Sequence, residues 1–175
     1  MKPLSLLLIV LLLIAASCGT KKTETATSPI DSVVVDSALA TTPAPALLAF
    51  GAIEGFTANN TLDLPDSVNY FLPGNADQLS KFFIVEGAES PDFIINYVVA
   101  VVCKPTRLAT TIAMDKVVTG ESSIDIYLTI VRGEAGAKTY RPTQLFAIER
   151  REGYPVMQFY VNGKKDKALV LVENP

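Results

Sequence analysis

The stretch Ile124-Asp125-Ile126-Tyr127-Leu128-Thr129-Ile130 indicates the fold more clearly than any other part of this 175-residue chain. Apolar side chains alternate with more polar ones over its whole length. Side chains of a β-strand point alternately to the two faces of a sheet, so this period of two predicts a strand with one buried face.

Strand-like segments recur on both sides of it at a spacing of about ten residues, each bounded by turn-forming residues. Residues 93–103 form a nearly continuous apolar run, which is typical of a strand covered on both faces. Gly133-Glu134-Ala135-Gly136 predicts a turn, and Asn162-Gly163 predicts a tight hairpin. The other predicted strands are residues 47–56, 68–72, 110–119, 144–150, 156–161 and 168–172.

One short helix is predicted over residues 75–83. Asn75 is a favourable N-cap, and Gln78 three residues later completes a capping-box pattern. Leu79, Phe82 and Phe83 then lie on one helical face. The expected fold class is mainly β (a β-rich α+β domain). It is an antiparallel β-sandwich or a closed sheet of about seven to eight strands with one short helix.

The N-terminus has the features of a targeting segment. Lys2 precedes an apolar run over residues 4–14, and Ala15-Ala16-Ser17 lead to Cys18. The small-small-Cys ending resembles the lipobox of bacterial lipoproteins; the alternative is an ordinary secretory signal followed by an unrelated cysteine. The resemblance implies a signal peptide over residues 1–17, lipidation of Cys18 and residence in a bacterial cell envelope. Gly19 follows the cysteine instead of an aspartate, which favours the outer membrane over the inner membrane.

Residues 18–46 are rich in Thr, Ser, Ala and Pro and contain no aromatic residue. Such a segment cannot bury enough apolar area to offset its ordering entropy, so a flexible stalk is expected. Its typical reach is about 30 Å. Asp31-Ser32-Val33 and Asp36-Ser37-Ala38 resemble Bacteroidetes O-glycosylation sites, which makes Ser32 and Ser37 candidate acceptors. A single β-rich domain is expected over residues 47–175.

Composition narrows the chemistry. The chain has no histidine, so Ser-His and Cys-His catalysis and every histidine-containing metal site are excluded. The net charge is −3 without a long basic stripe, and nucleic acid is therefore not an expected partner. Cys103 lies in an apolar run and is expected to be buried. No catalytic residue, metal ligand or cofactor site is predicted.

The order of features from about Val68 to Gly163 resembles the C-terminal domain family of PrcB-type protease-complex subunits. The family pattern of a helix, a buried strand, a Pro-Thr turn and two further strands matches residues 75–83, 97–102, Pro105-Thr106, 111–118 and 124–131, with Pro142 opening the next strand. After the Pro-Thr turn the family has a Gly-Gly-Tyr-Ser-like segment, whereas this chain has Arg107-Leu108-Ala109-Thr110. The resemblance implies a β-rich accessory domain that supports a protease without catalysis of its own.

The expected function is thus that of a membrane-tethered, non-catalytic domain that binds another envelope protein, for which a protease is one candidate. Polar loops at residues 105–110 and 138–143 are the expected contact surface, with Arg107, Thr110, Tyr140 and Arg141 as candidate partner-binding residues. Two alternatives stay open. A surface glycan- or small-ligand-binding lipoprotein would need a coplanar exposed set of aromatics, and an enzyme using carboxylates alone would need two of them in a cleft. The residues concerned are Tyr127, Tyr140, Tyr154 and Tyr160 for the first, and Glu86, Glu89 and Asp92 for the second.

Overall fold

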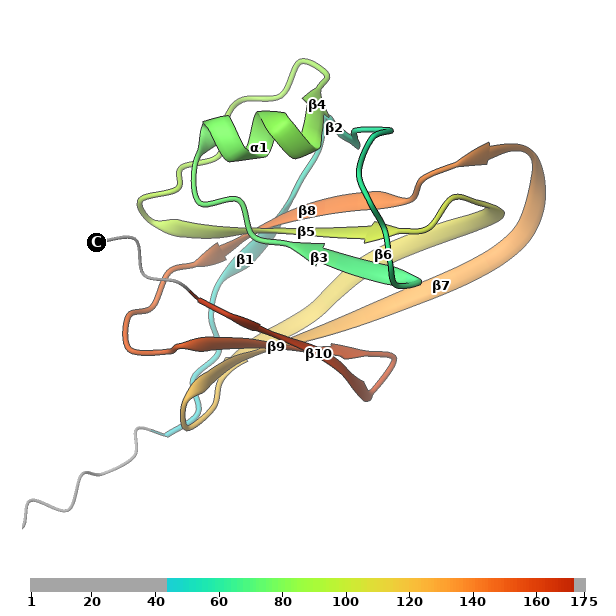
Figure 1. Ribbon diagram of the computed structural model, residues 1–175. Coiled ribbons are helices and arrows are strands. Elements are labelled where there is room, and N and C mark those ends of the chain that lie inside the picture. Colours follow the sequence, from blue (N-terminus) through green and yellow to red (C-terminus); the bar gives the residue numbers. More distant parts are fainter. Residues whose placement is uncertain (1–43, 172–175) are drawn as a thin grey trace, which may run out of the picture. The chain divides into compact units, whose positions relative to one another are not determined.

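The computed structural model describes residues 44–171, which fold into two four-stranded sheets, one two-stranded sheet and one short helix (Figure 1). The first sheet has the strand order β1-β8-β5-β3, the second has the order β10-β9-β7-β6, and β2 pairs with β4. The elements are β1 (Phe50–Ile53), β2 (Phe56–Ala58), β3 (Val68–Phe71), α1 (Ala76–Phe82), β4 (Phe83–Val85), β5 (Asn96–Cys103), β6 (Thr106–Thr119), β7 (Ser123–Tyr140), β8 (Thr143–Glu149), β9 (Val156–Val161) and β10 (Lys164–Val170).

The expected β-rich sandwich is confirmed, and the closed-sheet alternative is wrong. The strand count is ten instead of seven to eight. Residues 47–56 are divided between β1 and β2 near Gly55, whose φ of +81° favours glycine. The short strand β4, which follows α1 directly, was missed because three residues are too few to show a period.

The pairing is not entirely antiparallel, because β9 runs parallel to β7 with Ser123 opposite Val156. The cause is the intervening strand β8, which belongs to the other sheet. It returns the chain to the end where β7 began, so β9 sets out in the same direction as β7.

The helix forms as its sequence predicts. The Asn75 side chain accepts a hydrogen bond from the Gln78 amide at 2.9 Å, and Leu79 is buried. The Gln78 side chain accepts from the Gly74 amide at 2.8 Å, one residue before the partner in a standard capping box. The hairpin at Asn162-Gly163 is also confirmed, since both residues have the positive φ of a type I′ turn.

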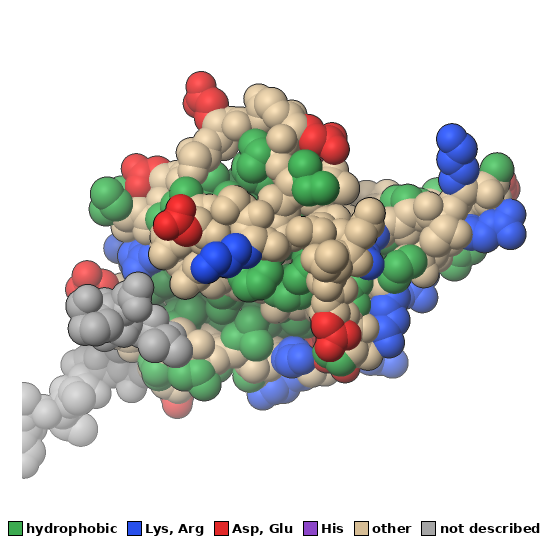
Figure 2. Space-filling view, turned by 45° about the horizontal axis from the view of Figure 1, so that its top comes forward, with side chains coloured by type: hydrophobic (Ala, Val, Ile, Leu, Met, Phe, Trp, Pro, Cys, Tyr) green, Lys and Arg blue, Asp and Glu red, His purple; other side chains and the backbone are tan. Residues whose placement is uncertain are grey.

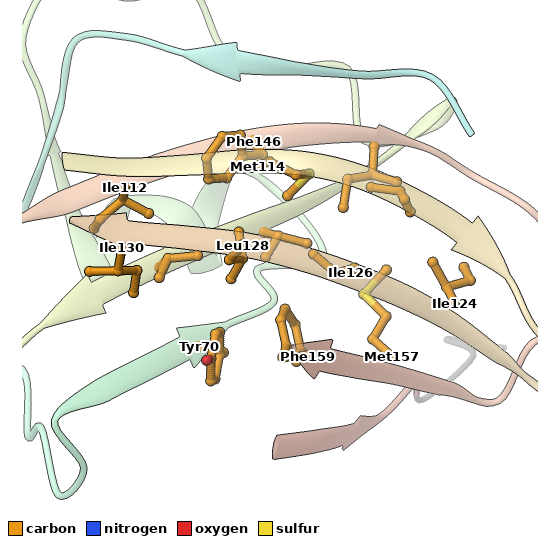
Figure 3. Close-up of a cluster of buried hydrophobic side chains, with 14 of the residues drawn as sticks. Tyr70, Ile112, Met114, Ile124, Ile126, Leu128, Ile130, Phe146, Met157 and Phe159 are labelled. Atoms are coloured by element: carbon orange, nitrogen blue, oxygen red, sulfur yellow. The ribbon is translucent and has the colours of Figure 1, made fainter. Parts of the chain in front are cut away.

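The strand β5 is covered on both faces, as its continuous apolar run predicts. Val99, Val101 and Cys103 face the core between the two large sheets. Strands β6, β7 and β9 contribute most of the other side chains of this core, among them Ile112, Ile126 and Phe159 (Figure 3). Val98, Ala100 and Val102 face a second cluster that includes Leu79 of the helix and Phe83 of β4. Cys103 is buried as expected, and burial raises the pKa of its thiol.

The two ends of the sandwich differ. The chain enters beside the end of β6, where the Ala46 amide donates to Thr119 Oγ1 at 2.8 Å and Leu47 lies opposite Val118. Pairing with β6 therefore begins before the expected boundary at residue 47. The crossings between the sheets lie at the other end of β6, a strand of 14 residues whose fully extended length would be about 45 Å. Cys18, Ser32 and Ser37 lie outside the described residues.

Candidate functional site

A two-stranded ribbon extends from the end opposite the chain entry. We define this β6–β7 ribbon as residues 106–111 of β6 and residues 131–140 of β7. All ten residues of its β7 part are exposed, and the ribbon extends beyond the sandwich before β7 bends back toward β8 (Figure 1). The turn expected at Gly133–Gly136 is wrong, because these residues lie inside the continuous strand β7. Glycine and alanine are compatible with a turn, but here these small residues form part of a strand with irregular pairing.

The irregularity is a large β-bulge. Leu108 lies opposite Ala135 and Thr106 lies opposite Tyr140, so four residues of β7 (136–139) face Arg107 alone. A second, smaller shift occurs between Leu108 and Thr110. Bulges bend a strand and strengthen its twist, which accounts for the curvature of the ribbon.

Side chains fasten this bulge. The Tyr140 hydroxyl donates to the Leu108 carbonyl at 3.0 Å and accepts from the Thr110 amide at 2.6 Å. Arg107 Nε donates to the Gly136 carbonyl at 3.2 Å. The structure thus places three of the four predicted contact residues in the bulged ribbon, where Thr110 and Tyr140 are hydrogen-bonded to each other and Arg107 is bonded to Gly136. Tyr140 fixes the shape of the ribbon with its hydroxyl, while its side chain is still 42% exposed.

The fourth residue, Arg141, is separated from this group. Its guanidinium donates to the carbonyls of Asn59 and Asn60, between β2 and β3, and the side chain is half-buried. Its Nε is buried without a hydrogen-bond partner within residues 44–171. Arg141 therefore holds the loop after β2 against the start of β8. The prediction missed this role because nothing local to Arg141 indicates contact with a segment 81 residues away.

The ribbon has an excess of positive charge, with Arg107, Arg132 and Lys138 against Glu134. Figure 2 shows Lys and Arg side chains along the arm at its right. The two ion pairs of the described part of the chain, Arg151–Glu149 and Lys167–Asp66, lie elsewhere. The cations of the ribbon are accordingly available to an acidic surface.

The four tyrosines of the glycan-binding alternative do not form one coplanar set, and that expectation is wrong. Tyr127 and Tyr160 stack at 4.7 Å between ring centroids, with Lys116 Nζ 4.4 Å from the Tyr127 centroid. Tyr140 lies in the ribbon, and Tyr154 packs against the main core. The Tyr127 and Tyr160 rings stack on each other across adjacent strands. Each ring therefore covers one face of the other, and the pair does not form a flat surface of two rings side by side.

Two of the three acidic loop residues, Glu86 and Asp92, have local partners. Glu86 accepts from Thr57 Oγ1 at 3.2 Å, and Asp92 Oδ1 accepts from the Ile94 amide at 2.8 Å. Within residues 44–171 no group of three His, Cys, Asp or Glu side chains is placed to hold a metal ion.

A cleft of about 360 Å³ lies near the chain-entry end, between Leu72, Tyr97, Tyr154 and Leu171. Arg150 is the one charged residue among those that line it. Its guanidinium lies over the Tyr97 ring at 4.6 Å and donates to the Phe93 carbonyl at 3.1 Å. These contacts fix the position of the guanidinium at the edge of the cleft.

By fold, the described part of the chain is a β-sandwich of the β-rich α+β class. A scan against protein-family models, a search of curated proteins and a search of solved structures found no match. No helix within residues 44–171 is both long and apolar enough to cross a membrane.

Proposed function

We propose that this protein is a lipid-anchored, non-catalytic binding domain of a bacterial cell envelope, and that its β6–β7 ribbon contacts another envelope protein. The observation that carries the proposal is the ribbon itself. Ten consecutive residues of β7 are exposed, yet they are held in a defined shape by the Tyr140 and Arg107 hydrogen bonds. An arm that is already held in one shape loses little conformational entropy when it binds. Its positive charge suits it to an acidic partner.

The position of the ribbon supports the same proposal. The chain enters the domain beside Thr119, at one end of β6, whereas the ribbon contains the other end of that strand. A tether through Cys18 would thus attach to the domain at the end opposite the binding surface. The ribbon would then be directed away from the site of attachment and toward partners.

The PrcB-type resemblance gives this proposal a more specific form, in which the partner is a protease. Arg107-Leu108-Ala109-Thr110, which replace the Gly-Gly-Tyr-Ser-like segment of that family, lie in the β6 part of the ribbon. A partner that binds the ribbon would therefore contact the residues in which this chain differs from the family pattern.

Site-specific photo-crosslinking in native membranes tests the binding surface. A crosslinker at Lys138 is expected to yield one discrete adduct, and a crosslinker at Lys165, on β10, serves as the control. Arg107→Glu with Arg132→Glu, in the protein that carries the crosslinker at position 138, should abolish that adduct while the far-UV circular dichroism spectrum stays unchanged. Equal adduct patterns from both positions would count against a binding ribbon.

Metabolic labelling with a fatty acid tests the anchor separately. Wild-type protein is expected to incorporate the label, and Cys18→Ser is expected to incorporate none. Cys103→Ser is the matched control because it removes the other cysteine of the chain. Labelling that survives Cys18→Ser would show that the anchor lies elsewhere.

A further inference from the structure

The most exposed large apolar side chains of residues 44–171 gather at the chain-entry end. They are Ile94 at 85%, Leu47 at 75% and Val170 at 72% exposed, and Ile95 follows at 61%. Leu47 lies opposite Val118 near the end of β6, and Val170 lies opposite Val156 at the start of β9. Ile94 and Ile95 immediately precede β5, whose first residue Asn96 pairs with Glu149 at the end of β8.

The Ile94-Ile95 turn is rigidly held although its side chains are exposed. The Asp92 carbonyl accepts from the Asn96 backbone amide at 3.2 Å, and Asp92 Oδ1 accepts from the Ile94 amide. On the other side, the Ile95 carbonyl accepts from the Arg150 amide at 2.9 Å. The backbone amide of Ile94 and the backbone carbonyl of Ile95 are consequently already hydrogen-bonded within the protein.

Charges beside this turn are partly neutralised within the protein. Glu149 forms an ion pair with Arg151 at 2.7 Å, and the Arg150 guanidinium lies over Tyr97. An apolar tip enters an apolar phase at lower cost where its backbone groups are hydrogen-bonded, as the Ile94 amide and the Ile95 carbonyl are. Isolated exposed apolar residues are common on protein surfaces. Ile94 and Ile95 are instead adjacent and both largely exposed, and neither side chain contributes to the core.

We infer that Ile94 and Ile95 insert into the surface of a lipid bilayer and dock the chain-entry end of the domain on the membrane. This inference rests on the lipid anchor proposed above. The occupant is indicated by where the undescribed N-terminal residues join the domain, since Ala44 and the three most exposed apolar side chains share one end. The anchor holds the domain near the bilayer, so a small apolar contact suffices for docking. The β6–β7 ribbon, at the other end, points away from the membrane.

The chain contains no tryptophan, and one substitution therefore creates a unique fluorescence probe. Ile94→Trp and, as the matched control, Val131→Trp on the ribbon are prepared in the full lipidated protein, Val131 being 56% exposed. Each is reconstituted in vesicles of phosphatidylcholine brominated on the acyl chains. We expect I94W emission to shift to the blue and to fall at least twofold relative to unbrominated vesicles, and V131W emission to remain unchanged.

Equal quenching of I94W and V131W, or none of either, in protein that floats with the vesicles would overturn the docking inference and leave the anchor intact. Failure of the wild-type protein to float with the vesicles would instead overturn the anchor. A second measurement does not depend on the folding of the tryptophan variants. Ile94→Asn with Ile95→Asn should increase trypsin cleavage after Arg150 and Arg151 in membrane-bound protein. Unchanged cleavage in that variant would also contradict docking.

Discussion

The two halves of β7 belong to one continuous strand and yet meet opposite environments. In residues 123–130 the apolar side chains are buried in alternation, whereas in residues 131–140 every residue is exposed. The first half is paired on both edges, by β6 and by β9, while pairing with β9 ends at Leu128. The comparison shows that one half is held by burial of side chains and the other by hydrogen bonds to a single neighbouring strand.

The boundary between the halves is marked by Asn162. Its side-chain amide donates to the Ile130 carbonyl at 3.1 Å, and its side-chain oxygen accepts from the Ile130 amide at 3.0 Å. One asparagine of the β9–β10 hairpin thus ends the sheet on this edge of β7. Beyond it, the ribbon depends on Tyr140 and Arg107.

Truncation in the buried half should have the largest effect. Ile126→Ala leaves a cavity in the core between the sheets, where Ile126 is fully buried. We expect a loss of about 2–5 kcal/mol in the free energy of unfolding, measured by denaturant titration. Lys138→Ala in the exposed half is the control, with a change within about 0.5 kcal/mol. Similar losses from both variants would contradict the contrast between the halves.

Removal of the boundary residue should have the next largest effect. Asn162→Ala deletes both hydrogen bonds to Ile130 and places alanine at a φ of +49°, where asparagine is better tolerated. We expect a loss of about 1–3 kcal/mol in the same titration. Hydrogen exchange should also become faster at the Ile130 amide. An unchanged exchange rate at the Ile130 amide would show that the Asn162 hydrogen bonds do not stabilise this part of β7.

High pH should destabilise the core into which the buried half of β7 packs. Tyr70 stacks on Phe159 at 4.1 Å and donates to the Asp166 carboxylate, and burial together with this carboxylate raises the pKa of Tyr70 well above 10. The unfolded chain releases the tyrosine proton near pH 10, whereas the folded protein retains it. Stability is therefore complete below pH 10 and falls above it, by about 1.4 kcal/mol at pH 11.

Tyr70→Phe is the control for this pH effect, because it removes the titrating group while keeping the ring. Its free energy of unfolding should decline less between pH 9 and pH 11 than that of the wild type. Parallel declines in the two proteins would assign the loss to other groups.

The smallest effect is expected from Tyr140→Phe, which removes the hydroxyl that bridges Leu108 and Thr110. The loss in global stability should be about 0.5–1 kcal/mol, since the bridge is partly exposed. Exchange of the Thr110 amide should nevertheless accelerate, while that of Ile126 stays the same. Equal protection of Thr110 in both proteins would mean that the ribbon keeps its shape without this bridge.

The elements that could be predicted are those whose reasons are local. Asn75 caps α1, Asn162-Gly163 forms the hairpin, and residues 98–103 are buried because their continuous apolar pattern permits nothing else. The ribbon could not be predicted from Gly133 and Gly136, because small residues suit a turn and a bulged strand equally. Likewise, the contact of Arg141 with Asn59 joins segments 82 residues apart.

The candidate site divides in the same way. Polar residues next to strong strands indicated Arg107, Thr110 and Tyr140, and all three lie in the β6–β7 ribbon. Their meeting depends on the unequal numbers of residues in the two strands of the ribbon, which becomes visible only once the register is known.

The amino-acid sequence by itself determined a β-rich class, one capped helix and a doubly covered central strand, because alternation, capping and apolar runs act over a few residues. Only the tertiary structure decided that the sheets stay open, that β9 runs parallel to β7, and that one half of β7 leaves the core as a ribbon. These features depend on which strands become neighbours, and that choice is made by packing between residues far apart in the chain.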